Sequence, residues 1–198
     1  MWYWTTHLYT KNTNISSSAL LDIICSVPEI NRVFDEIERL RLNNAYIAGG
    51  VITQIVWNNL HGFPLLHNIK DIDIVYFDMH TKVSDKRLEI NIMEAVGGGV
   101  KIDVTNQAFI HRWFKDEYGV ITPPLVSAED GIATWLPAFS IGVQRTENIY
   151  YVYAPFGLND LFKMIVRPNR RSMQISVYQE KTKGYKERWP NITIIPWS

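Results

Sequence analysis

The sequence contains one cysteine, no long apolar run and no excess of charge of either sign. A single cysteine cannot form a disulfide within the chain, so the fold cannot rely on internal disulfide bonds. That residue, Cys25, lies in the apolar segment LLDIICSV, a setting more typical of a small buried side chain than of a reactive thiol. The cysteine content therefore fits a reducing compartment.

The charges balance, because Lys and Arg together number 20 and Asp and Glu together also number 20. A balanced total gives no sign of a nucleic-acid or membrane partner, although a local charged patch remains open. No apolar run approaches the roughly 20 residues that cross a bilayer. The first residues, MWYWTTHLYTKNTN, lack the basic segment and apolar core of a secretion signal. We therefore expect a cytoplasmic protein with no membrane partner.

The sequence also lacks internal repeats, low-complexity tracts and a recognisable linker. Its 198 residues, of which 46% are hydrophobic, are enough for one well-packed domain and too few for two ordinary ones. We expect a single domain over residues 1–198.

The periodicity of the apolar residues indicates an α+β fold. Apolar residues three and four positions apart predict helices, and strict alternation predicts strands. The predicted helices are 28–42, 51–61, 84–96, 107–118 and 157–166. The predicted strands are 45–48, 69–77, 100–106, 139–144 and 149–154, of which the last two form a hairpin.

The segment NIKDIDIVYFD places two aspartates two residues apart on a predicted strand. Alternate side chains of a strand point to opposite faces of the sheet. Asp71 and Asp73 therefore share one face, and Ile72 and Ile74 share the other. Such a pair alone is often a solvated edge-strand face, so its meaning depends on the residues that accompany it.

A third carboxylate lies on the next predicted strand, VKIDVTN, where Asp103 shares a face with Lys101 and Thr105. If the two strands are neighbours, three carboxylates converge and repel one another. A hard divalent cation with oxygen ligands removes that repulsion. The simplest such cation is Mg²⁺, with Mn²⁺ as the alternative.

Two glycines stand between the first predicted strand and the following helix, in AGGVITQIVWN. Gly49 and Gly50 leave bare backbone at a helix N-terminus, where free N–H groups suit a phosphate. Glycines at a tight turn are equally expected for purely steric reasons. The order of the elements is more specific than either motif: strand, Gly-Gly, helix, Asp-x-Asp strand, helix, and a strand with a third Asp.

This ordered set resembles the nucleotidyltransferase superfamily, whose core has Gly-Gly or Gly-Ser at a helix start, Asp-x-Asp on the next strand and a third acid on a later strand. The segments AGGVITQIVWNNLHG, IKDIDIVYFD, VTNQAFIHRWF, APFGLNDLFKMIVRPN and YKERWPNITIIP are more specifically similar to a family of bacterial-type nucleotidyltransferases. The resemblance runs from about residue 48 to the end of the chain. It implies a mixed β-sheet flanked by helices, with a catalytic core at 43–106, a C-terminal part at 107–198 packed on it, and an N-terminal extension at 1–25 outside the resemblance.

The resemblance also implies a site and a reaction. Asp71, Asp73 and Asp103 would be the catalytic, metal-binding acids of an enzyme that moves a nucleoside monophosphate from a nucleoside triphosphate to an acceptor and releases pyrophosphate. The acceptor, whether small molecule, RNA or protein, is not implied, and the oligomeric state is not predicted. Gly49 and Gly50 would bind the nucleotide.

Two further basic residues are candidates for the same nucleotide. Lys163 and Arg167 are four positions apart on the predicted helix 157–166, so they would share one face and could bind a triphosphate. A solvated basic helix end is the commoner meaning of such a pair.

Two alternative functions use the same residues. One is a non-catalytic nucleotide- or partner-binding protein of regulatory or toxin–antitoxin type, against which the full set of acids argues. The other is a metal-dependent phosphohydrolase or nuclease, which explains the Gly-Gly element less well than triphosphate binding does.

Overall fold

The computed structural model describes residues 15–97, 99–118 and 121–197, which fold into a mixed α+β structure. Its elements in chain order are α1 (Ile15–Cys25), α2 (Pro28–Arg39), β1 (Tyr46–Ala48), α3 (Gly50–His61), β2 (Asp71–Tyr76), α4 (Asp85–Val96), β3 (Lys101–Asn106), the 3-10 helix η1 (Gln107–Arg112), α5 (Phe114–Tyr118), α6 (Ala128–Ile132), β4 (Gly142–Thr146), β5 (Ile149–Tyr153), α7 (Asn159–Phe162), β6 (Ile165–Val166), α8 (Ile175–Arg188) and β7 (Thr193–Ile194). None of the helices in these ranges is both long enough and apolar enough to cross a membrane.

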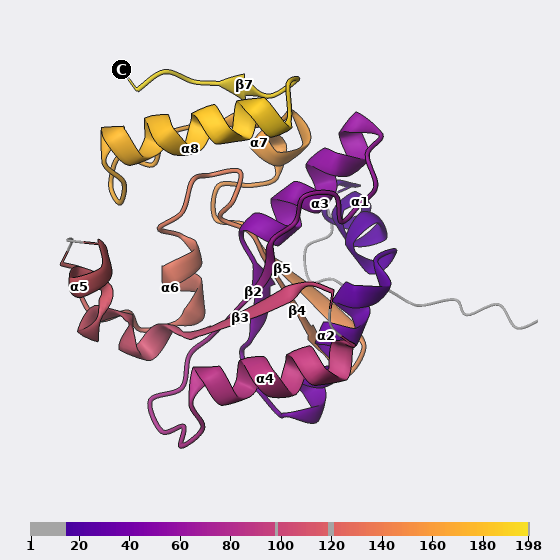
Figure 1. Ribbon diagram of the computed structural model, residues 1–198, viewed down its shortest axis with the longest axis vertical. Helices are drawn as coiled ribbons and strands as arrows, with labels where there is room; N and C mark the ends of the chain where they lie inside the picture. The colour runs from indigo at the N-terminus through magenta and orange to yellow at the C-terminus, as the bar shows by residue number, and fades with distance from the viewer. Residues whose placement is uncertain (1–14, 98, 119–120, 198) are drawn as a thin grey trace, which may run out of the picture.

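The central feature is a five-stranded sheet with strand order β3-β2-β1-β4-β5. Strands β2 and β3 are parallel, and the other neighbours are antiparallel. In Figure 1, α1 and α3 lie on one side of this sheet and α5 and α6 on the other, while α8 and β7 lie together at the top. The expectation of a mixed sheet flanked by helices is confirmed.

The main core lies on one face of the sheet. Ile72 and Ile74 of β2 are fully buried there, together with Ile102 and Val104 of β3 and apolar residues of α1 to α4. A smaller cluster on the opposite face joins Tyr46, Ala48, Val75, Ala128 and Ile132. Because the acids of β2 alternate with its isoleucines, they lie on the face of the smaller cluster, which is less completely covered.

Local sequence explains where several elements begin and end. Pro28 opens α2 in its first turn, where the missing N–H costs nothing. Ser84 caps α4 by accepting a hydrogen bond from the Arg87 backbone N–H, and Gly97 ends that helix with φ of 88°. Strands β4 and β5 form the predicted hairpin through a two-residue turn in which Glu147 and Asn148 have φ of 50° and 62°.

Two predicted helices differ from the structure, and a third helix, α8, was not predicted. The helix expected at 107–118 is split into η1 and α5 at Trp113, whose φ of −126° leaves the helical region. The helix expected at 157–166 has only the four residues of α7, followed by strand β6. The sequence did not predict α8, because Tyr178 and Thr182 are its only buried residues and it has no continuous apolar stripe.

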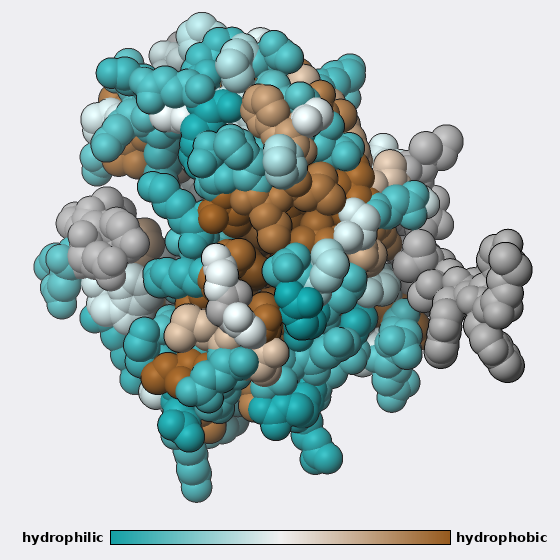
Figure 2. Space-filling model, turned by 45° about the vertical axis from the view of Figure 1, so that its right-hand side comes forward, coloured by the Kyte–Doolittle hydropathy of each residue, from teal (hydrophilic) through white to brown (hydrophobic). Residues whose placement is uncertain are grey.

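Apolar side chains also reach the surface of the described residues. Figure 2 shows an apolar band across the middle of one face, with hydrophilic side chains above and below it. A surface that carries both apolar and hydrophilic side chains is ordinary for a protein of this size.

Candidate active site

The register of the parallel strands β2 and β3 brings the three acids together. Asp73 pairs directly with Asp103, and Asp71 pairs with Lys101. Paired residues of neighbouring strands point to the same face, so the three carboxylates and the lysine share one face of the sheet. On the other side of β2, Ala48 pairs with Asp73, so the end of β1 and the glycine turn after it lie beside the same carboxylate.

The three carboxylates bring several negative charges close together on this face. The pKa of Asp73 is raised from 3.8 to about 7, first by burial and then by the charges of Asp71 and Asp103. Lys101 and Lys181 act in the opposite direction and lower it. A positive ion at this place would favour the ionised form of Asp73.

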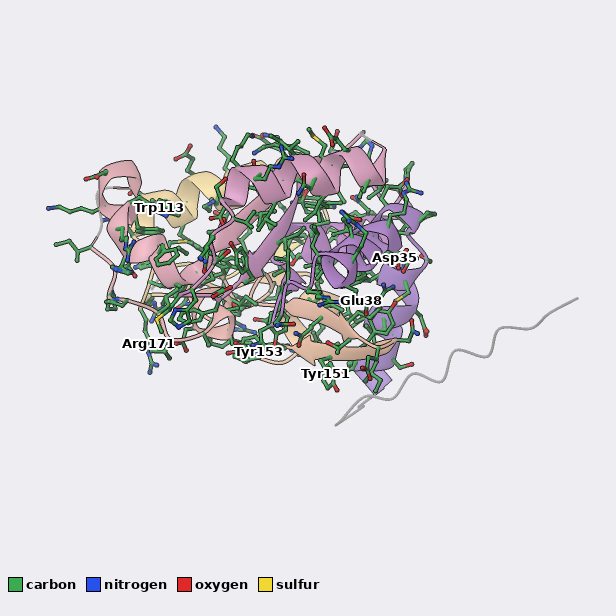
Figure 3. The ribbon with its side chains drawn as sticks, turned by 90° about the horizontal axis from the view of Figure 1, so that it is seen from below. Asp35, Glu38, Trp113, Tyr151, Tyr153 and Arg171 are labelled. Carbon is green, nitrogen blue, oxygen red and sulfur yellow. The ribbon has the colours of Figure 1, made fainter. Side chains whose placement is uncertain are left out.

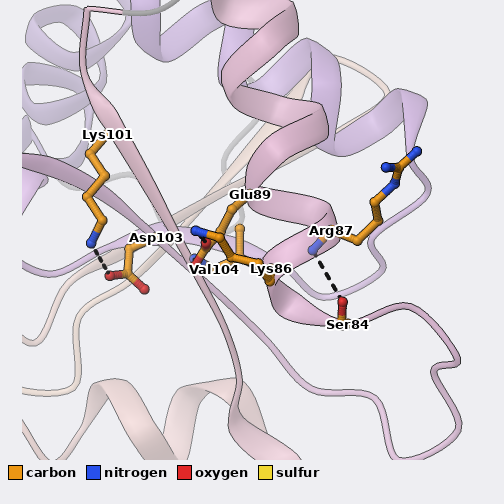
Figure 4. Close-up of polar contacts among 7 residues, drawn as sticks. All are labelled: Ser84, Lys86, Arg87, Glu89, Lys101, Asp103 and Val104. Atoms are coloured by element: carbon orange, nitrogen blue, oxygen red, sulfur yellow. Dashed lines mark hydrogen bonds and ion pairs between the residues drawn. The ribbon is translucent and has the colours of Figure 1, made fainter.

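Asp103 already has a cationic partner. Its Oδ2 lies 3.0 Å from the Nζ of Lys101, and 38% of its side chain is exposed (Figure 4). Among residues 15–97, 99–118 and 121–197, no group of three His, Cys, Asp or Glu side chains is arranged as a ready metal site. The oxygen donors nevertheless suit a hard divalent cation. Asp71 and Asp73 would hold it, and Asp103 would join them through its second oxygen or after release from Lys101.

The glycine turn lies against the acids. Gly49 has φ of 69°, and a Cβ there would lie 2.6 Å from Cζ3 of Trp135, so any other residue would be strained. A Cβ on Gly50 would lie 3.6 Å from Oδ2 of Asp73. The N-terminus of α3, with the positive end of its helix dipole, therefore adjoins the carboxylate face.

A sequence model described as "Nucleotidyltransferase" matches residues 35–194, which is most of the chain. The chain belongs to the nucleotidyltransferase family. No curated protein matches it. A solved structure described as "The NMR structure of the protein reveals a CCA-adding enzyme head domain" is similar in fold to this nucleotidyltransferase. Its TM-score is 0.73 with 22% identity, over 90% of this chain and 95% of the other.

The structure places the predicted basic pair of this nucleotidyltransferase differently from the sequence prediction. Helix α7 ends at Phe162, so Lys163 and Arg167 do not share a helical face. Arg167 donates through Nε to Oδ2 of Asp160 at 2.7 Å, and Lys163 is exposed just beyond the helix. Within the described residues, neither has a hydrogen bond or ion pair with the acids of β2 and β3. The expectation of one helical face was wrong because the helix is too short.

The face that carries the three acids has basic and polar neighbours that the sequence did not single out. The charge of Lys181 on α8 lowers the pKa of Asp73. The pKa of Tyr185 is raised to about 12, mainly by burial, with the charge of Asp73 contributing. Arg188 lies with Nη1 3.4 Å from Oε1 of Gln54, on α3.

A signal for three of these residues was present. Lys181, Tyr185 and Arg188 have i, i+4 and i+7 spacing, which places them on one face of a helix. This spacing could be recognised only if a helix was expected over these residues.

Proposed function

We propose that the protein transfers a nucleoside monophosphate from a nucleoside triphosphate to an acceptor and releases pyrophosphate. The observation that carries this proposal is the pairing of Asp73 with Asp103, with Asp71 on the same face and Gly50 beside Asp73. Membership of the nucleotidyltransferase family supports the reaction class.

The acids and the glycines have different roles in this proposed reaction. Asp71, Asp73 and Asp103 supply oxygen ligands for Mg²⁺, with Mn²⁺ as the alternative. The bound cation would neutralise phosphate charge and stabilise the charge that develops on the reacting oxygens. Gly49 and Gly50 allow the triphosphate to approach backbone N–H groups at the start of α3.

The transfer itself forms one bond and breaks one. The hydroxyl oxygen of the acceptor attacks the α-phosphorus, and the bond between the α-phosphorus and the oxygen that bridges to the β-phosphorus breaks. Pyrophosphate leaves with that bridging oxygen, and the proton of the acceptor hydroxyl passes to solvent. The carboxylates, with the divalent cation that they would hold, would orient the acceptor and the α-phosphate for this displacement, and the α3 N-terminus would bind the leaving group.

The test compares α-labelled with γ-labelled nucleoside triphosphates. Each is incubated with the protein, Mg²⁺ or Mn²⁺ and a cell extract, which is then separated into small-molecule, RNA and protein fractions. We expect the α-label in one fraction and the γ-label in pyrophosphate. Inorganic phosphate or cleaved strands would instead indicate a hydrolase or nuclease, and no labelled product would indicate a binding protein.

A further inference from the structure

Helix α8 is fixed against α3 by the residue that follows it. Trp189 is buried and donates through Nε1 to Oδ1 of Asn58, at 2.8 Å. Its ring also packs edge-on against Trp57, with 5.4 Å between ring centroids. The C-terminal end of α8, which precedes Trp189, is therefore held in a defined place beside α3.

Arg188 is a partly buried cation held by neutral groups. Its guanidinium lies 4.5 Å from the ring centroid of Trp189 and 5.4 Å from that of Tyr185. Its hydrogen bonds are to the backbone oxygen of Gly184, at 3.3 Å, and to Gln54, at 3.4 Å. Within the part of the chain that the structure describes, it has no carboxylate partner.

Arg145, another partly buried arginine, differs from Arg188 because it has carboxylate partners. Arg145 on β4 lies within 2.5 Å of a carboxylate oxygen of Asp35 and 2.8 Å of one of Glu38. Figure 3 labels these two acids on α2. The charge of Arg145 is thus satisfied within the fold, whereas the charge of Arg188 is available to an anion.

A chain of contacts connects Arg188 with the acids. Arg188 bonds Gln54, and a Cβ on Gly50 would lie 3.0 Å from Nε2 of Gln54 and 3.6 Å from Oδ2 of Asp73. Lys181 lies seven positions before Arg188 and is exposed on the same face of α8. Arg188 therefore borders the glycine turn from the side of α8, and Lys181 extends the same basic face, from which its charge also acts on Asp73.

We propose that Arg188 and Lys181 form the subsite for the β- and γ-phosphates of the nucleoside triphosphate. This inference rests on the proposed function, because it adds two cations of α8 to the α3 N-terminus as the groups that bind the leaving pyrophosphate of that reaction. The triphosphate carries several negative charges to a face that already has three carboxylates, so cations are needed beside the helix N-terminus. Arg188 offers a planar pair of donors, and Lys181 offers a mobile ammonium.

The experiment measures binding by calorimetry in Mg²⁺. The ligands are inorganic tripolyphosphate, each ribonucleoside triphosphate and the corresponding nucleosides, and the variants are Arg188→Gln and Lys181→Gln. The matched control is Lys183→Gln, because Lys183 is exposed on α8 but two positions from Lys181 and so on a different face. Lys163→Gln tests the pair predicted from the sequence.

We expect both α8 variants to bind triphosphate and tripolyphosphate about tenfold or more weakly, since each loses a charge-assisted contact. Nucleoside binding should not change, and Lys183→Gln should behave as wild type. The variant Arg188→Lys, which keeps the charge, should recover part of the affinity. Melting temperatures of all variants identify any loss that is due to unfolding, and exposed Lys181 gives a test with little effect on folding.

The outcomes separate this inference from the proposed function. Wild-type affinity for tripolyphosphate and triphosphates in both α8 variants would overturn the subsite, even if the enzyme transfers nucleotides. If α8-dependent binding is seen but no nucleotide is transferred, the subsite stands and the proposed reaction fails. A wild-type protein that binds neither tripolyphosphate nor any triphosphate would overturn the subsite as well.

Discussion

Asp73 is the residue on which the site depends most. Its carboxylate is partly buried at the point where β1, β2, β3 and the start of α3 meet, and two other acids share its face. Burial and like charges both oppose ionisation, which explains why its pKa rises to about 7. The ionised carboxylate destabilises the folded state, and a bound cation or ligand would relieve that destabilisation.

The raised pKa predicts a pH dependence in the metal-free protein. The folded protein holds the proton of Asp73 up to pH about 7, but the unfolded chain releases it near 3.8, so this group favours folding at low pH and its contribution is lost as the pH rises through 7. Asp73→Asn removes the effect. In chelator, we expect the variant to be more stable than wild type by ~1–3 kcal/mol at pH 8, with a smaller difference at pH 5.

Denaturant unfolding of both proteins at the two pH values measures this difference. The comparison with Asp73→Asn cancels the titration of all other groups that behave alike in the two proteins. A variant that is much less stable than wild type at pH 8 would mean that the carboxylate supports the fold.

At the scale of elements, the turn between β1 and α3 connects the fold to the site. Gly49 is required by its backbone angle and by Trp135. Gly50 has ordinary helical geometry, and Gln54 and Asp73 are the only described residues within 4 Å of the place where its Cβ would lie. The two glycines therefore have different roles although they are adjacent.

Alanine substitutions should separate those roles. Gly49→Ala should destabilise the protein by about 1–3 kcal/mol, because of the positive φ and the close approach of Trp135. Gly50→Ala should melt near wild type, since the Gln54 side chain can move, but its methyl group should weaken triphosphate binding. Melting curves and calorimetry with nucleoside triphosphates check both. Equal losses of stability in the two variants would contradict this division.

The faces of the strands could be predicted from the sequence, whereas helix α8 could not. The alternation in DIDIVYF and KIDVTN was enough to place Asp71 and Asp73 on one face of their strand and Asp103 on one face of the next, because strand parity is a local property. That the two faces match depends on the parallel pairing of β2 with β3 in the structure. The alternation also placed Lys101 beside Asp103, but the ion pair that they form depends on rotamers. Helix α8 was missed because tertiary contacts through Trp189, rather than an apolar stripe, hold it in place.

At the scale of the whole molecule, the C-terminal part completes the region around the acids. Buried Asn58 on α3 donates to the backbone oxygens of Leu65 and His67 at 2.9 Å each and accepts from Trp189. One side chain thus joins α3, the segment leading to β2 and the end of α8.

Asn58→Ala should therefore lower the stability of the whole molecule. It leaves the Trp189 N–H and two backbone oxygens without this partner, so we expect a loss of about 1–3 kcal/mol and a fall in melting temperature of several degrees. Asn59→Ala, on the exposed side of the same helix, is the control and should melt as wild type. The idea that α8 is held through Asn58 would be wrong if the two variants melted at the same temperature.

In the proposed site, Asp71, Asp73 and Asp103 bind a divalent cation and a nucleoside triphosphate. Binding can be measured without an acceptor, by melting wild type and Asp73→Asn in chelator and in excess Mg²⁺ with each nucleoside triphosphate. We predict that Mg²⁺ with at least one triphosphate raises the melting temperature of wild type and that Asp73→Asn loses this shift while melting no lower than wild type in chelator. If Asp73→Asn melts far lower in chelator and the ligand-induced shift persists, Asp73 is a structural residue and the three acids do not form the proposed site.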